Sequence, residues 1–224
     1  MPEPVLYRWP ANAALGRAVP KTKFYDHGNV PTAVRGKFVD DIQRITWAYK
    51  LADDTIRLSG TARVPEIQVF TIEAKGADIS DEVLLAIDKT VHFPIIFEVA
   101  GSDRVRMVAA QKTLDGKTPR VATYFTTGWQ PADAPRRPLP TALHLPNLYE
   151  VLLASLLPAP TRVGETVLEA TGRLDRARKL QREVAALEKK LRAEPQLNRK
   201  IELRKQLRER EVVLRELTHP RTSI

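Results

Sequence analysis

The chain has 224 residues, of which 43% are hydrophobic, so it can bury a substantial core and does not have the composition of a disordered protein. It contains no cysteine, which excludes disulfides, thiolate metal ligands and cysteine nucleophiles. The net charge of +9 favours polyanionic partners or simply solubility.

The sequence shows no signal for a metal or a membrane. Its four histidines stand far apart and lack metal-ligand spacing. The first residues, MPEPVLYRWP, do not form a secretory signal, and no apolar run is long enough to cross a bilayer. We therefore expect no metal, no cofactor and no membrane partner, and a soluble cytoplasmic protein.

The first 52 residues are predicted to contain helix. ANAALGR, after Pro10, predicts a short helix, and VPKTKFYDH is typical of an edge strand or a loop. Apolar residues then recur every three or four positions, at Val34, Phe38, Ile42, Ile45 and Tyr49. This spacing predicts one amphipathic helix over residues 32–52.

A strand, a helix and a second strand follow within a short stretch. Residues 66–76 are β-branched and aromatic and end at a glycine, so they predict a strand. Ser80 is a plausible N-cap for a helix over 81–91. Residues 94–101 form the continuous apolar run of a strand buried on both faces. Such a crossover makes its two strands parallel.

Two further segments, 105–113 and 120–129, are predicted to pair as antiparallel strands, with the turn signal LDGK between them. We therefore expect an α/β domain over residues 1–129, with a small mixed sheet of about four strands and covering helices. Four prolines make 130–141 a linker or an extended strap. Residues 142–164 hold a short apolar helix that must dock on another surface.

The C-terminal region, 165–218, is predicted to be an antiparallel helical hairpin with a coiled-coil seam, followed by a tail over 219–224. Helices over 165–193 and 196–218 flank Pro195, which is disfavoured inside a helix but tolerated in a first turn. The seam has little core of its own and needs a partner helix, a second copy or another protein. The predicted seam residues are Leu180, Val184, Leu187, Leu191, Ile201, Leu203, Leu207 and Leu214.

The hairpin is also basic, with 16 Lys and Arg against 10 Asp and Glu from residue 165 onward. Interleaved glutamates are typical of a solvated coiled coil, whereas the excess cations favour contact with nucleic-acid phosphate or an acidic protein. No aromatic residue in the hairpin is available to stack on bases. The candidate binding residues are Arg178, Lys179, Arg182, Lys189, Lys190, Arg192, Arg199, Lys200, Arg204, Lys205 and Arg208.

Glu73-Ala74-Lys75 is the one motif that suggests catalysis. Many metal-dependent nucleases carry Glu-x-Lys at a strand end with an upstream aspartate, for which Asp53 or Asp54 could serve here. Two arguments oppose this: the motif is common by chance, and the predicted strand order differs, since those nucleases place three consecutive strands before the crossover helix. The paired acids Asp40 and Asp41 favour solvated helix surface. We therefore expect no catalytic residue, with Glu73, Lys75 and Asp54 as the only candidates.

Several segments together resemble a known family. They are VPKTKFY, FVDDIQRITWAYKL, PEIQVFTIEAKG with AIDKTVHFPIIFEV, LPNLYEVLLASLL and QLNRKIELRKQL. In this order they are similar to an uncharacterised bacterial family, domain-of-unknown-function family 4391. The resemblance implies genes beside helicases and DNA methyltransferases of restriction-like antiphage defence loci. It implies no catalytic residue.

Three hypotheses follow. The first is a non-catalytic accessory or adaptor protein of a DNA-defence system, which binds a helicase or methyltransferase of the same locus, and the DNA backbone as well if phosphates are its target. The second is a Mg²⁺-dependent nuclease that uses Glu73 and Lys75. The third is a coiled-coil module that forms homo-oligomers through the hairpin.

Overall fold

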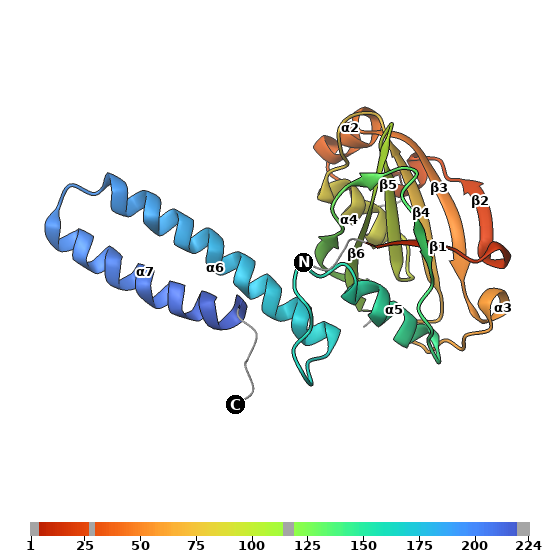
Figure 1. Cartoon of the computed structure of the whole chain (residues 1–224). Helices are drawn as coiled ribbons and strands as arrows, with labels where there is room; N and C mark the ends of the chain where they lie inside the picture. Colours follow the sequence, from red (N-terminus) through yellow and green to blue (C-terminus); the bar gives the residue numbers. More distant parts are fainter. Residues whose placement is uncertain (1–4, 27–29, 114–118, 219–224) are drawn as a thin grey trace. The chain divides into compact units, whose positions relative to one another are not determined.

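The computed structural model describes residues 5–26, 30–113 and 119–218 (Figure 1). The chain divides into two compact units, residues 1–160 and residues 161–224, called here the sheet unit and the hairpin unit. In the part of the chain that is described, no helix has the length and apolar character needed to span a membrane.

The sheet unit alternates strands with short helices. Its strands are β1 (Leu6–Arg8), β2 (Ala14–Ala18), β3 (Ile42–Leu51), β4 (Ile67–Ala74), β5 (Ile95–Ala100), β6 (Arg104–Thr113), β7 (Arg120–Thr126), β8 (Gln130–Pro131) and β9 (Arg136–Pro138). Its helices are η1 (Ala11–Ala13), α1 (Thr22–Tyr25), α2 (Thr32–Asp40), α3 (Asp53–Ile56), α4 (Asp81–Thr90) and α5 (Leu145–Ala154).

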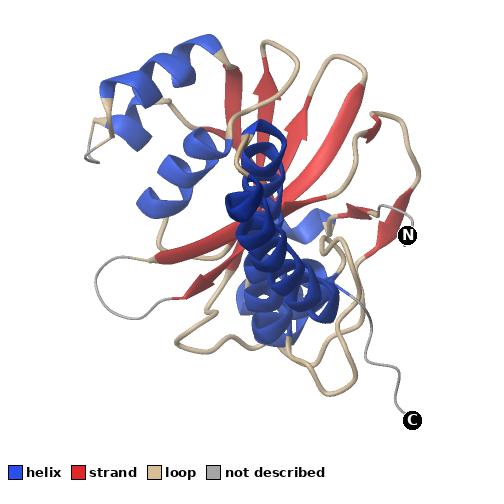
Figure 2. Ribbon diagram, turned by 90° about the vertical axis from the view of Figure 1, so that its left-hand side faces the viewer, coloured by secondary structure: helices blue, strands red, loops and turns tan. Residues whose placement is uncertain are grey.

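The main sheet has seven strands in the order β2-β3-β4-β5-β6-β7, with β8 paired to β6. Figure 2 draws the strands in red. Strands β4 and β5 are parallel and joined by α4, which confirms the predicted crossover, and the other neighbours are antiparallel. The α/β class is confirmed. The sheet is larger than the predicted four strands because β2, β3 and β8 join it. Strand β1 pairs in parallel with β9, so the proline-rich segment returns to the N-terminal strand.

The predicted helix over residues 32–52 is wrong in its second half. Helix α2 ends at Asp40, and residues 42–51 form β3. Bulges interrupt the β3–β4 register between Ile42 and Arg44 and between Trp47 and Tyr49. Because a bulge inserts one residue, it breaks the two-residue alternation of a strand. The apolar residues of a bulged strand therefore fell three or four positions apart, which is the spacing of a helix.

The N-terminal predictions also need correction. The segment after Pro10 is one 3-10 turn followed by β2, rather than a helix. Within VPKTKFYDH, residues 22–25 form the short helix α1, rather than an edge strand or a loop. The predicted turn LDGK lies outside the described residues.

The main core lies between one face of the sheet and helices α1, α2 and α4. Phe38 of α2, Ile87 of α4 and Phe97 of β5 belong to one cluster of buried side chains. Alternate residues of the same strands, including Met107 of β6, are buried outside this cluster, and alternation directs them to the opposite face. A hydrogen bond links helix α5 to β6: the hydroxyl of Tyr149 donates to the carbonyl oxygen of Ala110 over 2.7 Å.

A buried polar network ties α4 to β6 and β7. The ammonium of Lys112 lies 2.5 Å from Oδ1 of Asp88, and the hydroxyl of Tyr124 donates to Oδ2 over 2.6 Å. Lys112 also donates to the carbonyl oxygens of Asp88, Val91 and Phe93 at the end of α4. Burial raises the pKa of Asp88 and lowers that of Lys112. Since each group is the partner of the other, the network fixes α4 against the sheet.

The hairpin unit contains two long helices, α6 (Val167–Ala193) and α7 (Leu197–Thr218), which lie side by side and antiparallel (Figure 1). The side chain of Thr166 and that of Glu169 form a capping box at the start of α6. Pro195 lies in the connection between the helices, where the sequence pattern places the break.

Candidate functional site

The residues of the Glu-x-Lys motif lie along one border of the main sheet, where strands end, and this border is called here an edge of the sheet. Strands β2, β4 and β5 end at this edge and β3 begins there, as the register of the pairs requires. Glu73 lies opposite Arg44 in the β3–β4 ladder, and Ala74 lies opposite Ile42. The chain immediately before Ile42 is therefore brought beside the motif, and it carries Asp40 and Asp41.

Hydrogen bonds fix this arrangement. The backbone N–H of Lys75 donates to the carbonyl oxygen of Asp41 over 2.8 Å. The ammonium of Lys75 donates to the carbonyl oxygen of Val39 over 2.6 Å. Arg44 donates from Nε to Oε1 of Glu73 over 3.0 Å. The motif is thus held against the end of α2 and the start of β3, with Asp41 directly across from Lys75.

Asp54 does not take part in this site, which corrects the sequence-based candidate. In the β3–β4 ladder Leu51 pairs with Ile67, so Asp53 and Asp54, which follow Leu51, lie at the opposite edge of the sheet. Glu73 lies six positions after Ile67 in β4, about 20 Å of extended chain. Asp54 instead pairs with Lys50 over 3.0 Å. Neither acid can share a metal ion with Glu73.

The strand order no longer opposes a nuclease-like centre. Strands β2, β3 and β4 are consecutive antiparallel neighbours that precede the crossover helix α4. The bulged pattern of β3 has the spacing of a helix, so a helix was predicted where the second of these strands lies. The objection rested on that error.

The donor set at this edge fits a hard divalent cation better than a zinc ion. Among the described residues, no three His, Cys, Asp or Glu side chains cluster as metal ligands. Mg²⁺ keeps several water ligands and is held in many enzymes by one or two carboxylates and a substrate phosphate. Oε2 of Glu73 accepts no hydrogen bond from a described residue, and Asp41 forms no ion pair within the same part of the chain. These two carboxylates are the residues that could hold such an ion.

The hairpin seam is only half-buried. No residue of α7 is fully buried, and in α6 the buried apolar side chains Ala170, Leu174 and Ala177 precede the predicted seam. Ile201 was predicted in the seam but is 57% exposed. It lies outside the seam because Leu203 and Leu207 take up the face toward α6. The half-buried predicted seam residues are Leu180, Val184, Leu187, Leu191, Leu203, Leu207 and Leu214.

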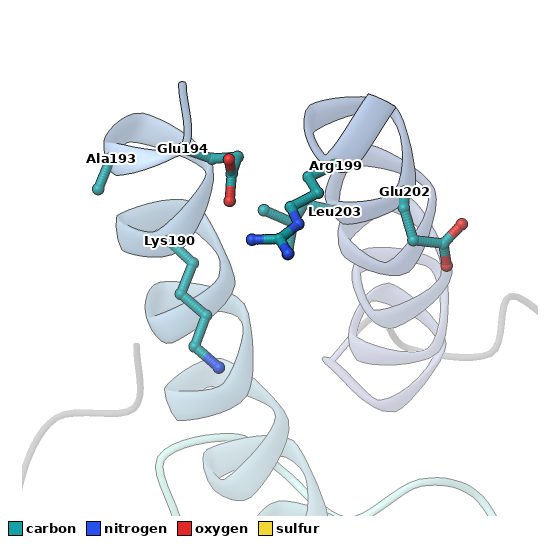
Figure 3. A pocket seen from close by; sticks show the side chains of 6 residues that line it. All are labelled: Lys190, Ala193, Glu194, Arg199, Glu202 and Leu203. Atoms are coloured by element: carbon teal, nitrogen blue, oxygen red, sulfur yellow. The ribbon is translucent and has the colours of Figure 1, made fainter. Parts of the chain in front are cut away.

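The predicted cationic residues spread along both helices. Arg178 and Lys200 are half-buried, and the other nine are exposed: Lys179, Arg182, Lys189, Lys190, Arg192, Arg199, Arg204, Lys205 and Arg208. At the hairpin tip, Lys190, Glu194 and Arg199 line an open hollow of about 380 Å³ between the two helices (Figure 3). Its mixed charge and openness make it a poor site for a small ligand.

The base of the hairpin holds its most buried polar contacts. Arg173 binds the carboxylate of Glu165 with Nε at 2.7 Å and Nη2 at 2.9 Å, and its Nη1 donates to the carbonyl oxygen of Leu217. Arg162 donates to the carbonyl oxygens of Glu216 and Leu217. Hydrogen bonds from Arg173 lower the pKa of Glu165. Two arginines thus satisfy the last carbonyls of α7, where the helix dipole favours cations.

Sequence reasoning missed three residues of the sheet-edge site: Asp41, Arg44 and Lys21, whose ammonium donates to the carbonyl oxygen of Ile42. The available signal was the composition of ITWAYKL, whose β-branched and aromatic residues favour a strand. With that strand recognised, Asp41 just before it would have been a candidate for the upstream aspartate that accompanies Glu-x-Lys in metal-dependent nucleases.

Comparison with known proteins identifies a family but no function. The model of a domain of unknown function, DUF4391, matches residues 8–214. No curated protein and no solved structure shows a significant match to the chain. Because the matched residues cover most of the sequence, the chain belongs to the DUF4391 family.

Proposed function

We propose that the sheet unit cleaves phosphodiester bonds of nucleic acid with a divalent cation held by Asp41 and Glu73, as part of a DNA-defence system. One observation supports the cleavage: the β3–β4 register brings Asp41 across from Glu73-x-Lys75, at the edge where three consecutive antiparallel strands lead into a crossover helix. The defence setting comes from the family resemblance alone.

The residues at this edge divide the chemistry among them. When bound, a Mg²⁺ ion would polarise the scissile phosphate and acidify a bound water. Asp41 and Glu73 supply the carboxylates that retain it. Lys75 supplies a positive charge for the attacking water or for the phosphate oxygens, where negative charge develops. Arg44 is 61% exposed and can release Oε1 of Glu73 without disturbing the core.

A cleavage assay with point variants tests this proposal. The purified full chain is incubated with supercoiled plasmid and with single-stranded DNA, in Mg²⁺, in Mn²⁺ and in EDTA. We expect nicking that requires the metal, and a loss of about 100-fold or more in Asp41→Asn, Glu73→Gln and Lys75→Met, because each removes a ligand or a catalytic charge.

Asp54→Asn is the matched control. It removes the acid that the sequence favoured, at the opposite edge of the sheet, and we expect full activity. Wild-type protein that cleaves neither substrate in either metal contradicts the proposal. Activity that survives Glu73→Gln but disappears in Asp54→Asn would also contradict it, since the structure separates those carboxylates.

An accessory role is the second candidate, and the outer face of α7 favours it. Leu197, Ile201 and Val212 are 68%, 57% and 52% exposed. Arg204, Lys205 and Arg208 lie on the same helical face as Ile201, which is an apolar and cationic surface suited to a protein partner with acidic groups. Under this proposal the hairpin binds the helicase or methyltransferase encoded in the same locus.

Co-purification tests the accessory role. The chain is expressed with the helicase and the methyltransferase of its own locus, and the retained partner is quantified. We expect Ile201→Asp to reduce retention at least about 10-fold, since it places a charge in the apolar part of the interface. Val163→Asp, at a fully exposed site outside α7, is the control. Equal retention by both variants would contradict the role of this face.

A further inference from the structure

Two lysines that follow different strands lie close together, beside the acidic residues at this edge of the sheet. Lys21 follows β2 and Lys75 follows β4. Their ammonium groups donate to backbone carbonyls only three residues apart, Ile42 for Lys21 and Val39 for Lys75. Both carbonyls belong to the junction at which α2 ends and β3 begins, so the two positive charges share one small region.

No carboxylate among the described residues neutralises the charge of either lysine. Asp41 lies across from Lys75, yet in the described part of the chain neither lysine forms an ion pair with a carboxylate. An ammonium has three N–H donors, and the structure gives each of these two groups one acceptor. Burial, followed by the charge of Lys75, lowers the pKa of Lys21. Such an arrangement is stabilised by an anion that accepts from both groups.

We propose that Lys21 and Lys75 together bind one phosphate group of a nucleic-acid strand, next to the Asp41–Glu73 carboxylates. A phosphodiester fits because its two non-bridging oxygens can accept from two separate donors, and its single negative charge offsets the repulsion between the lysines. The inference deepens the proposed function and rests on it for the choice of ligand. It requires binding only, and it assigns Lys21 a role that the Glu-x-Lys motif does not include.

A binding measurement in EDTA separates phosphate contact from any metal. The full chain is titrated against a fluorescein-labelled 12-base-pair DNA duplex, and anisotropy is followed at several salt concentrations. We expect Lys21→Met to weaken binding about fivefold and to reduce the slope of log K against log salt by about 0.9, the value for one lost phosphate contact. Lys21→Arg should restore both values because it keeps the charge.

Lys23→Met is the matched control, since Lys23 is an exposed lysine two residues away on α1. It should stay within twofold of wild type. Wild-type protein that does not bind the duplex overturns the inference, as does Lys21→Met with unchanged affinity and salt slope.

A measurement at Lys21 itself distinguishes DNA binding at the proposed phosphate site from DNA binding by the hairpin. The pKa of Lys21 is followed by NMR of ¹³C-labelled lysine, with its signal assigned by its loss in Lys21→Arg. A bound phosphate favours the charged ammonium, so the duplex should raise the pKa of Lys21. No change in this pKa at saturating duplex overturns the inference, even if the protein binds DNA elsewhere.

Failure of the inference and failure of cleavage give different results. If duplex binding depends on Lys21 but no substrate is cut in Mg²⁺ or in Mn²⁺, the phosphate site stands and the nuclease proposal fails. If the chain cuts DNA while Lys21→Met binds the duplex like wild type and the pKa of Lys21 in the wild-type chain does not respond to the duplex, the nuclease proposal stands and the role of Lys21 is rejected.

Discussion

The two units of this protein achieve their stability in different ways. The sheet unit packs helices on a seven-stranded sheet and encloses many fully buried side chains, including a buried ion pair. The hairpin unit has a half-buried seam, and α7 contains no buried residue. Since helix pairs gain most of their stability from packing, the hairpin depends on its base contacts and on whatever covers it. The same kind of substitution should therefore lower the free energy of unfolding more in the sheet unit than in the hairpin unit.

Spectroscopy can follow the two units separately. All three tryptophans, Trp9, Trp47 and Trp129, lie in the sheet unit, whereas the long helices α6 and α7 lie in the hairpin unit. Tryptophan fluorescence therefore reports unfolding of the sheet unit, and the part of the circular dichroism change at 222 nm that occurs without a tryptophan transition reports the hairpin. The predictions below use both signals.

The largest effect is expected from Lys112→Met in the sheet unit. This change leaves the carboxylate of Asp88 buried without its cation, at 2% side-chain exposure. We expect a loss of about 3–5 kcal/mol in the free energy of unfolding, measured by urea titration of tryptophan fluorescence. The double variant Asp88→Asn with Lys112→Met should recover part of it. A loss of less than about 1 kcal/mol in the free energy of unfolding would show that the Asp88–Lys112 network does not make the sheet unit more sensitive to substitution than the hairpin unit.

Glu165→Gln should give the largest effect within the hairpin unit. It removes the charge from a carboxylate that binds two nitrogens of Arg173, and hydrogen bonds to charged groups contribute about 1.5–3 kcal/mol. We expect a lower melting temperature by circular dichroism at neutral pH, with an unchanged tryptophan transition. Glu169→Gln at the exposed capping box should cost less.

The same pair predicts a pH dependence. Arg173 lowers the pKa of Glu165 below its ordinary 4.5, so the folded state favours the ionised carboxylate. The pair contributes fully above pH 4.5, and this contribution is lost as the pH falls through the lowered pKa. The difference between wild type and Glu165→Gln in hairpin melting temperature should therefore shrink in acid. A difference in melting temperature that grows below pH 4.5 would contradict the expected direction of this pH dependence.

A smaller effect is expected at the seam. Leu187→Asp places a charge on the half-buried face toward α7, and we expect a loss of about 1–2 kcal/mol in hairpin stability. Leu197→Asp is the matched control, because Leu197 is 68% exposed and should tolerate the change. Equal melting temperatures for the two variants would show that the seam does not hold the helices together.

The smallest effect is expected at the turn. Pro195→Ala removes the residue that cannot continue a helix, but the packing of α6 on α7 and the arginines at the base should keep the hairpin closed. We expect a change within about 1 kcal/mol, mainly through the unfolded chain. Small-angle scattering should detect no extended rod. An elongated particle would show that the proline, rather than packing, decides the hairpin.

Much of the fold was readable because local patterns agreed with tertiary structure. The crossover β4-α4-β5 carries a glycine end signal, a serine at the N-cap position and a continuous apolar run, and each is a local signal of its element. The hairpin break at Pro195 follows from a missing N–H. The strand β3 was missed because its bulges depend on the partner strand β4 and leave a helix-like spacing in the sequence.

The candidate site shows the same division. The sequence alone determined that Glu73 and Lys75 lie at the end of a strand and that the C-terminal hairpin is basic, since composition and periodicity are properties of one segment. Only the tertiary structure decided that Asp41 and Lys21, rather than Asp54, lie beside them, because strand register brings together residues that are distant along the chain. Periodicity can identify a strand, but the choice of neighbours is made by pairing and packing across the whole sheet.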